Sequence, residues 1–493
     1  MVSADYCITV DRVPKSLYTE IANNQAQWDQ WSGLGFLNTN APMDLISNSV
    51  IGTVDYIESY QFLTIDTSLY PGSFKERLLL ELPNLDHSVG GLLISTDNFQ
   101  GLNFIQEKFS KKIDCLHIDP PYNTATSGFL YKNQYQHSSW LTLMQQTSAR
   151  IQRLLSEDGV FQCHIDENEY ENLFLMLNDV GVPNSGSVIW DKKNPMLGRK
   201  GVATQHEYIL WRSAENGPVY LKGDSVLKII QKAAGFISAL GGVNYESRQA
   251  FSKWINAQND LTGGEKAYRF IEDDGRVYRG VAMGAPEPRT DPKFFIPLVH
   301  PITGIVCPIP PNGWSRTPDT INDLIQRKEI LWGSDHNSQP QKKVFLNIES
   351  KRQLSSVIQD ASSGKKYMDA LGLAFPYCHP VSLYEQLFGA VKNGREGIFC
   401  DYFAGSGTTA HAVVSLNRSD NGNRKYILME QGSYFDDVIK KRVQKIIYSA
   451  NWKDGKPTAP ETGISHAFKV IKLESYEDTL NNLELRRTTE QGD

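Results

Sequence analysis

The chain has 493 residues, too many for one core of ordinary size, so two or three folded units are expected. Hydrophobic residues make up 40% and charged residues 22%, a globular composition, and no stretch approaches the roughly 18 continuous apolar residues of a membrane span. The formal net charge of −6 argues mildly against a nucleic-acid partner, although the sum can hide a local basic face.

Six cysteines are spread singly along the chain, without a Cys-x-x-Cys pair. They support neither a zinc ribbon nor a thioredoxin-like motif, and they suit a reducing compartment. The adjacent pair Cys378-His379 is more typical of structural residues than of metal ligands. The first residues lack the basic start and apolar core of a secretory signal. We therefore expect a cytoplasmic protein, and no metal is implied.

From about residue 92 the chain alternates short apolar runs with helix-like segments, after an extension over 1–85 of unclear role. This alternation is typical of a mostly parallel sheet with helices on both faces. In chain order we predict a strand over 92–94, a helix over 102–109, a strand over 114–118, a helix over 140–155 ended by Gly159, and strands over 160–165, 187–190 and 208–211.

The rhythm breaks over 218–363, where glycine and proline become frequent. We interpret this region as an inserted, irregular domain between two halves of one α/β core, at 86–217 and 364–450. A charged tail over 451–493 follows. In the second half we predict a helix over 382–391, a strand over 397–402, a helix opening at Gly405, a strand over 425–430 and a helix over 435–447.

The sharpest motif is Asp119-Pro120-Pro121-Tyr122-Asn123, at the carboxyl end of an apolar strand. Ligands of open α/β sheets bind at such ends. The Asp119 carboxylate and the Pro120 carbonyl could accept both protons of an aromatic amine and free its lone pair for attack. The two prolines would fix the turn, and Tyr122 offers a flat face for an extruded base. The alternative is a Pro-Pro turn that ends a strand, with Asp119 as a cap.

A second motif, Phe403-Ala404-Gly405-Ser406-Gly407-Thr408, follows another predicted strand and opens a helix. By itself it satisfies the dinucleotide fingerprint, and Glu430 lies 25 residues past Gly405, where an acid would bind a ribose. A glycine turn lets the backbone approach a cofactor, and this holds for nicotinamide and methyl-donor enzymes alike. The loop alone therefore does not distinguish a nicotinamide enzyme from a methyl-donor enzyme.

Together the two motifs resemble those of the DNA amino-methyltransferases. The tetrad Asp119-Pro120-Pro121-Tyr122 comes first, and the glycine loop starts at Phe403, 284 residues after Asp119. This is the order of the β class of that family. The aspartate at position 119 resembles the adenine-N6 enzymes, since the cytosine-N4 relatives usually carry serine. The resemblance implies S-adenosylmethionine as cofactor, Asp119, Pro120, Pro121 and Tyr122 as catalytic residues, and cofactor contacts from Asp97, Phe403, Gly405, Gly407, Thr408, Glu430 and His379.

His379-Pro380-x-x-Leu383 is similar to the family's Lys-Pro-x-x-Leu, with His379 in place of the lysine. This departure leaves open how the cofactor carboxylate is held, and His379 could equally be a helix-start residue without a role. Segments of the insert, such as His300-Pro301 and Gly313-Trp314, resemble the modification subunits of type III restriction systems. The likeness covers about 90–480, and it leaves open a homodimer, a nuclease or helicase partner subunit, and a fragment of a longer protein.

The resemblance thus implies a permuted Rossmann-like methyltransferase core with an inserted target-recognition domain. Its activity would be methylation of adenine N6 in double-stranded DNA by base flipping, in restriction-modification or phage defence. Two alternatives remain: a catalytically silent specificity module derived from a methylase, and an NAD-dependent oxidoreductase.

The loop over 191–201 holds four basic residues against one acid. We expect these residues to contact DNA phosphates; the alternative is a solvated surface loop. They are Lys192, Lys193, Arg199 and Lys200.

Overall fold

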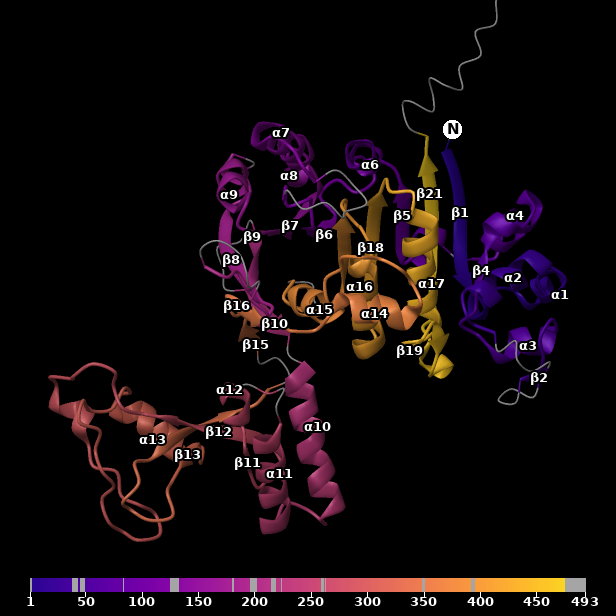
Figure 1. Ribbon diagram of the computed structural model, residues 1–493. Helices are drawn as coiled ribbons and strands as arrows, with labels where there is room; N and C mark the ends of the chain where they lie inside the picture. Colours follow the sequence, from indigo (N-terminus) through magenta and orange to yellow (C-terminus); the bar gives the residue numbers. More distant parts are fainter. Residues whose placement is uncertain are drawn as a thin grey trace, which may run out of the picture. The chain divides into compact units, whose positions relative to one another are not determined.

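The computed structural model of the chain contains two compact units (Figure 1). Residues 1–221 and 353–493 form the first unit, and residues 222–352 form the second. Among the described helices, none is both long and apolar enough to cross a membrane. The structure describes residues 2–37, 43–44, 49–82, 84–124, 133–179, 181–195, 202–213, 219–222, 224–258, 261, 263–347, 351–391 and 395–474.

The first unit is built on an 11-stranded sheet whose six central strands, β7, β6, β17, β18, β5 and β21, all run parallel. Strands from the two halves of the chain interleave, since β17 and β18 lie between β6 and β5. The strands, in spatial order, are β16 (Val357–Gln359), β8 (Asn184–Asp191), β9 (His206–Ser213), β7 (Leu155–Ile165), β6 (Ile113–Ile118), β17 (Glu396–Asp401), β18 (Asn423–Glu430), β5 (Gly91–Ser95), β21 (Ala467–Leu473), β1 (Val2–Thr9) and β4 (Thr64–Asp66).

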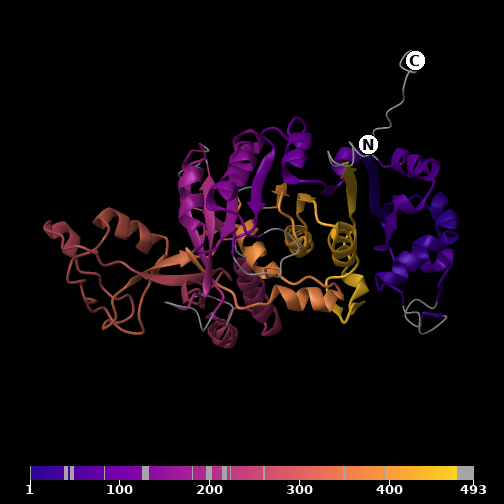
Figure 2. The same cartoon turned by 45° about the horizontal axis from the view of Figure 1, so that its top comes forward.

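Helices cover both faces of this sheet (Figure 2). Consecutive residues of a strand point to opposite faces. On β6, Cys115 packs into the core under α14 to α17, whereas Leu116 packs into the core under α6 to α9. The helices of the two layers are α6 (Asn98–Ile105), α7 (His137–Ser148), α8 (Ile151–Leu154), α9 (Tyr170–Asn178), α14 (Gly364–Leu371), α15 (Val381–Gly389), α16 (Thr408–Asp420) and α17 (Lys441–Tyr448).

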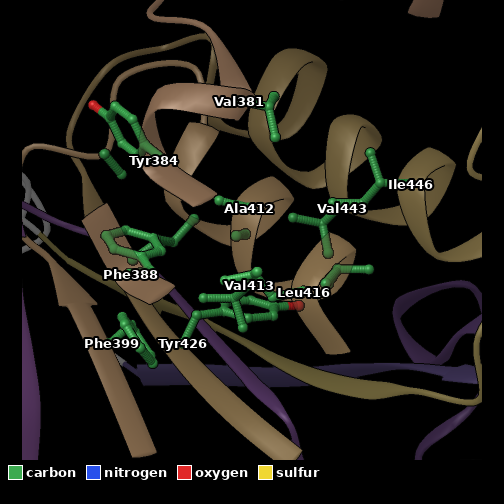
Figure 3. Packing of buried hydrophobic residues seen from close by; sticks show 14 of the residues in the cluster. Val381, Tyr384, Phe388, Phe399, Ala412, Val413, Leu416, Tyr426, Val443 and Ile446 are labelled. Carbon is green, nitrogen blue, oxygen red and sulfur yellow. The ribbon is translucent and has the colours of Figure 1, made fainter. Parts of the chain in front are cut away.

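Figure 3 shows how the second layer is held. Phe388 of α15, Val413 of α16 and Val443 of α17 meet Phe399 and Tyr426 of the sheet, and all five side chains are buried. Burying each large apolar side chain contributes about 1.5–3 kcal/mol, so this cluster fixes α15 and α16 against β18 and against β17, the strand that leads into the glycine loop.

The N-terminal and C-terminal segments differ from the expected extension and tail. β1 pairs with β21, and β21 pairs with β5, so both segments extend the central sheet. Their apolar side chains, such as Ile8 and Phe468, are buried there. The remaining elements of these segments are α1 (Tyr18–Ala22), α2 (Gln25–Gly33), α3 (Val54–Ser59), α4 (Gly72–Leu80), α5 (Leu85–Ser88), β2 (Met43–Asp44), β3 (Ser49–Val50), β19 (Trp452–Lys453) and β20 (Lys456–Pro457).

One predicted boundary is wrong. Gly159 does not end a helix; it lies inside β7, which begins at Leu155. The register between β6 and β7 shifts near this point, and a Cβ at Gly159 would lie 2.9 Å from the Ile113 carbonyl oxygen. The glycine therefore permits a close approach of two backbones, which a helical reading of the apolar spacing does not foresee.

The second unit contains more regular structure than the expected irregular domain. Helices α10 and α11 pack with β11 and β12 around Ile229, Phe251 and Ile255. A second cluster surrounds the buried Trp314. The elements are α10 (Asp224–Ala239), α11 (Tyr245–Ala257), α12 (Gly263–Lys266), α13 (Pro318–Gln326), β11 (Phe270–Ile271), β12 (Val277–Ala282), β13 (Ile330–Leu331) and β14 (Gln341–Phe345), and β10 (Tyr220–Lys222) and β15 (Lys351–Gln353) mark the junctions with the first unit.

Candidate active site

The two sequence motifs meet at the point where the order of the parallel strands reverses. From β6 the chain proceeds outward to β7, whereas from β17 it proceeds to β18 on the other side. Asp119 directly follows β6, and Asp401 is the last residue of β17. In open α/β sheets the crevice outside such a switch point binds ligands.

A cavity of about 530 Å³ opens at this edge. Residues from both halves of the core line it, so a ligand bound to the glycine loop would lie beside Asp119. Of the residues predicted for the site, those that line the cavity are Asp97, Asp119, Pro121, His379, Phe403, Gly405, Thr408 and Glu430. Three other residues predicted for the site are not among the described residues that line the cavity: Pro120, Tyr122 and Gly407.

The glycine loop is held in a conformation that other residues rarely adopt. Gly405 has a φ of 51° and Gly407 a φ of 84°. Gly407 is the N-cap of α16, so it turns the chain into the helix, and it does not line the cavity itself. Glycine populates this left-handed region without the steric cost of a side chain. The loop thus presents its backbone to the cavity.

Glu430 fixes the loops on both sides of the cavity. Its Oε2 accepts a hydrogen bond from the Gly405 N–H at 2.9 Å, and its Oε1 accepts one from the Gly432 N–H at 2.8 Å. Burial raises the pKa of Glu430, against these two hydrogen bonds. An acid at the end of β18 therefore shapes the glycine turn and also lines the cavity.

Two further acids line the same cavity. Asp97 is the N-cap of α6, where it accepts a hydrogen bond from the Gln100 N–H at 3.0 Å. Asp401 is buried and accepts hydrogen bonds from the Thr409 hydroxyl at 2.7 Å and the Phe403 N–H at 3.0 Å. Burial raises the pKa of Asp401 to about 7 despite these bonds. Sequence reasoning did not assign Asp401, although it ends the strand next to β6.

Hydrogen bonds with neighbouring side chains hold the Asp-Pro-Pro-Tyr turn in place. The Trp140 indole N–H donates to the Pro121 carbonyl at 2.7 Å. Asn123 has a φ of 60°, and its side chain donates to Glu169 at 2.6 Å. The Tyr122 hydroxyl donates to Glu207 Oε2 at 3.1 Å. These contacts fix the direction in which Asp119 leaves the strand.

His379 lies between two carboxylates. Its Nδ1 is 3.1 Å from Asp119 Oδ2, and its Nε2 is 3.0 Å from Glu207 Oε2. Burial alone would lower the pKa of His379, but Asp119 and Glu207 outweigh it and raise that pKa to about 10. Burial also opposes the ionised form of Glu207, yet His379 and Lys192 lower its pKa to about 2. The structure thus places His379 on the Asp119 carboxylate as well as at the cavity wall.

The predicted basic loop divides into different environments. Lys192 forms an ion pair with Glu207 and lies 5.0 Å from the Trp190 ring centre. Lys193 is exposed. Arg199 and Lys200 lie outside the described residues. Lys192 therefore faces the inner network, whereas Lys193 faces outward.

His164, Glu207 and His379 offer possible ligand atoms within 4.8 Å of one another. The His164 and His379 rings stack at 4.5 Å with an interplanar angle of 24°, so their in-plane lone pairs do not converge on one point. Glu207 already pairs with Lys192 and His379. This arrangement favours an ion-pair network over a metal centre.

Sequence reasoning gave no role to Glu207, which lies directly before the strand predicted over 208–211. The signal that could have found it is a lone acid at the start of an apolar strand, since β9 continues through Ile209, Leu210 and Trp211, all buried. Buried carboxylates are almost always paired, which points to nearby cations.

The fold and the site combine a doubly wound α/β core with a cavity that the glycine loop and the Asp119 carboxylate both line. The chain belongs to the DNA methylase family, whose model matches residues 113–441.

Among curated relatives, the chain is 26% identical to the EcoP15I Mod subunit of a type III restriction-modification enzyme from Escherichia coli, over 78% of this chain and 65% of that one. It is 24% identical to the StyLTI Mod subunit from Salmonella typhimurium, over 73% and 56%. The chain thus spans between about half and two thirds of these relatives. Among solved structures, it is similar to PvuII DNA methyltransferase (cytosine-N4-specific), with 10% identity, a TM-score of 0.37, and coverage of 73% of this chain and 86% of that one.

Proposed function

We propose that this chain transfers a methyl group from S-adenosylmethionine to the N6 amine of an adenine in double-stranded DNA. The observation that carries the proposal is the shared cavity: Asp119 and the glycine loop line one space of about 530 Å³. A methyl donor held by the loop would lie against an amine held by the carboxylate.

The residues of the cradle fit such a cofactor. Gly405 brings backbone to the cavity wall, and an added Cβ there would meet only the Phe403 carbonyl within 4 Å. Phe403 offers an apolar ring, while Asp97 and Glu430 offer carboxylates for ribose hydroxyls. When bound, the cofactor supplies an electrophilic methyl group on a sulfonium. The protein's task is then to position the amine and accept its hydrogen bonds.

Asp119 and the Pro120 carbonyl would accept the two N–H bonds of the amine, which localises the lone pair on nitrogen for attack on the methyl carbon. With the methyl donor bound, the nitrogen would displace the sulfonium sulfur at the methyl carbon, and Asp119 would pass the surplus amine proton to solvent. The base must leave the duplex to reach this cavity. Tyr122 is not among the lining residues, so the stacking role proposed for it requires its ring to move toward the base. Adenine rather than cytosine is proposed because aspartate heads the tetrad.

The second unit would read the DNA sequence. Residues 222–352 hold 18 Lys and Arg against 14 Asp and Glu, a net charge of +4, so the rest of the chain carries −10. The overall charge of −6 therefore conceals a positive unit, as phosphate binding requires. In the core, Lys193, Arg199 and Lys200 would add phosphate contacts, whereas Lys192 pairs with Glu207.

The relatives that support a proposal about partners are Mod subunits of type III restriction-modification enzymes. We propose that this chain likewise assembles with a restriction subunit, forms a homodimer and acts in the cytoplasm in defence against phage DNA. Size-exclusion chromatography of the chain with and without such a subunit tests both assemblies.

The activity is tested by incubating the full chain with DNA and S-adenosylmethionine, digesting the DNA and measuring nucleosides by mass spectrometry. We expect N6-methyladenine from the wild type and at least about a 100-fold loss in Asp119→Asn, with DNA affinity retained because phosphates supply most of it. N4-methylcytosine would refute the choice of base. DNA binding without any methylation would support the silent module instead, and cofactor titration that detects NAD alone would support the oxidoreductase.

A further inference from the structure

Four side chains of alternating charge form a series of ion pairs that ends at the Asp119 carboxylate. It consists of Lys192, Glu207, His379 and Asp119, in that order. We propose that His379 is a positioning residue: as a buried imidazolium it keeps Asp119 ionised and aimed at the substrate amine. The inference rests on the proposed function and adds a residue through which Asp119 acts.

The geometry allows His379 few alternatives. Its side chain is 11% exposed, and each ring nitrogen faces a carboxylate oxygen at close to 3 Å. Only the protonated ring can donate from both nitrogens at once, whereas a neutral ring would direct a lone pair at one of the two carboxylates. The two acids thus specify the charged form by hydrogen bonding as well as by charge.

The other groups around the ring are compatible with that charge. The Tyr384 hydroxyl lies 3.3 Å from Nδ1, and the Tyr122 hydroxyl lies 3.4 Å from Nε2. The His164 ring stacks on one face, and burial together with His379 and His117 lowers the pKa of His164 well below its ordinary value. His164 is therefore neutral and adds no second positive charge. The edge of Trp190 completes the surroundings.

The consequence for Asp119 is direct. As an acceptor for the amine protons, it must carry its charge at neutral pH. Without His379, no cation would lie between the Asp119 carboxylate and the buried Glu207 carboxylate, and uncompensated like charges favour a proton on one of the two acids. A protonated Asp119 cannot accept the amine hydrogen bond in the same way, so methyl transfer would fail at a pH where the wild type is active.

The test is the pH profile of kcat for the wild type and three variants of the full chain. In His379→Gln we expect the acidic limb to move upward by at least about one pH unit, with activity recovering as the pH rises. In His379→Lys, which restores a cation, we expect the limb to return toward the wild type. The matched control is His466→Gln, because His466 is also buried but precedes β21 at the opposite edge of the parallel strands. Its limb should not move.

A lower kcat in His379→Gln with an unmoved limb would overturn the proposal and leave only a packing role. If that variant fails to fold by circular dichroism, the wild type still decides the question without any turnover. Its ring carbon resonances, with His379 assigned through His379→Lys, should show an imidazolium at pH 8, and a neutral ring there would overturn the proposal. Methyl transfer by the wild type is a separate readout, so its absence would refute the proposed function and not the state of His379.

Discussion

At the scale of single residues, Lys192 and Lys193 are adjacent in sequence but differ in what they contact. Lys192 pairs with Glu207, and through it with His379, whereas Lys193 is exposed. A basic residue that neutralises a buried acid contributes to the site, and one that faces solvent can meet a phosphate. We therefore expect Lys192 to support the site through Glu207 and Lys193 to contact DNA.

We expect Lys193→Ala to weaken DNA binding for all sequences and to flatten the slope of log affinity against log salt by about 0.9, the effect of one lost phosphate contact. Lys192→Ala, its matched neighbour, should leave that slope nearly unchanged and lower kcat, since Glu207 loses one of its two cations and keeps only His379. Fluorescence anisotropy of labelled DNA over a salt series measures the slopes. A flattened slope in Lys192→Ala alone would reverse the assignment.

How far the site could be predicted from the sequence depends on how local each signal is. Asp119 and Gly405 stand in short motifs at strand ends, and the cavity brings them together. The contact of His379 with Glu207 spans 172 residues and depends on how α15 packs against the sheet. No local pattern encodes that distance, so sequence reasoning could place His379 only as a departure from a motif.

At the scale of elements, strands are foreseen better than their order. The apolar run over 114–118 became β6, and the run over 425–430 became β18. The position of β17 between β6 and β18 follows from long-range pairing, which apolar periodicity does not report. α10 was missed because glycine and proline nearby suggested irregular chain, although Val226, Ile229 and Ala233 have helical spacing and are buried.

The turn into α16 gives a prediction at this scale. Gly407→Ala places a side chain at a φ of 84°, which should destabilise the first unit by about 1–2 kcal/mol and weaken cofactor binding. The control is Gly33→Ala in α2, where an added Cβ meets nothing within 4 Å and stability should hold or rise by about 0.4–1 kcal/mol. Urea unfolding and calorimetric titration with S-adenosylmethionine check both. Equal losses in the two variants would contradict the role of this turn.

At the scale of the whole molecule, charge is divided between the two units. The second unit carries +4 and the remainder −10. A negative core repels DNA unless a separate unit or loop holds the duplex, so recognition and chemistry are expected to reside in different parts of the chain.

Exchange of residues 222–352 for the matching segment of a relative with a different target sequence tests this division. We expect the methylated sequence to follow the inserted segment, while the product stays N6-methyladenine because the core is unchanged. Single-molecule sequencing of DNA from cells that express the hybrid reports both. An unchanged target sequence would assign recognition to the core.

The interleaved strand order also determines when the chain can fold during synthesis. β6 ends at Ile118, but its neighbour β17 starts only at Glu396. β5 likewise pairs with β18, which is synthesised after β17. At translation rates of about 5–20 residues per second, β6 stays without this partner for roughly 15–60 s. Through that interval an apolar strand keeps an open edge, a known template for aggregation, so we expect the nascent chain to be most prone to aggregation until its second half has left the ribosome.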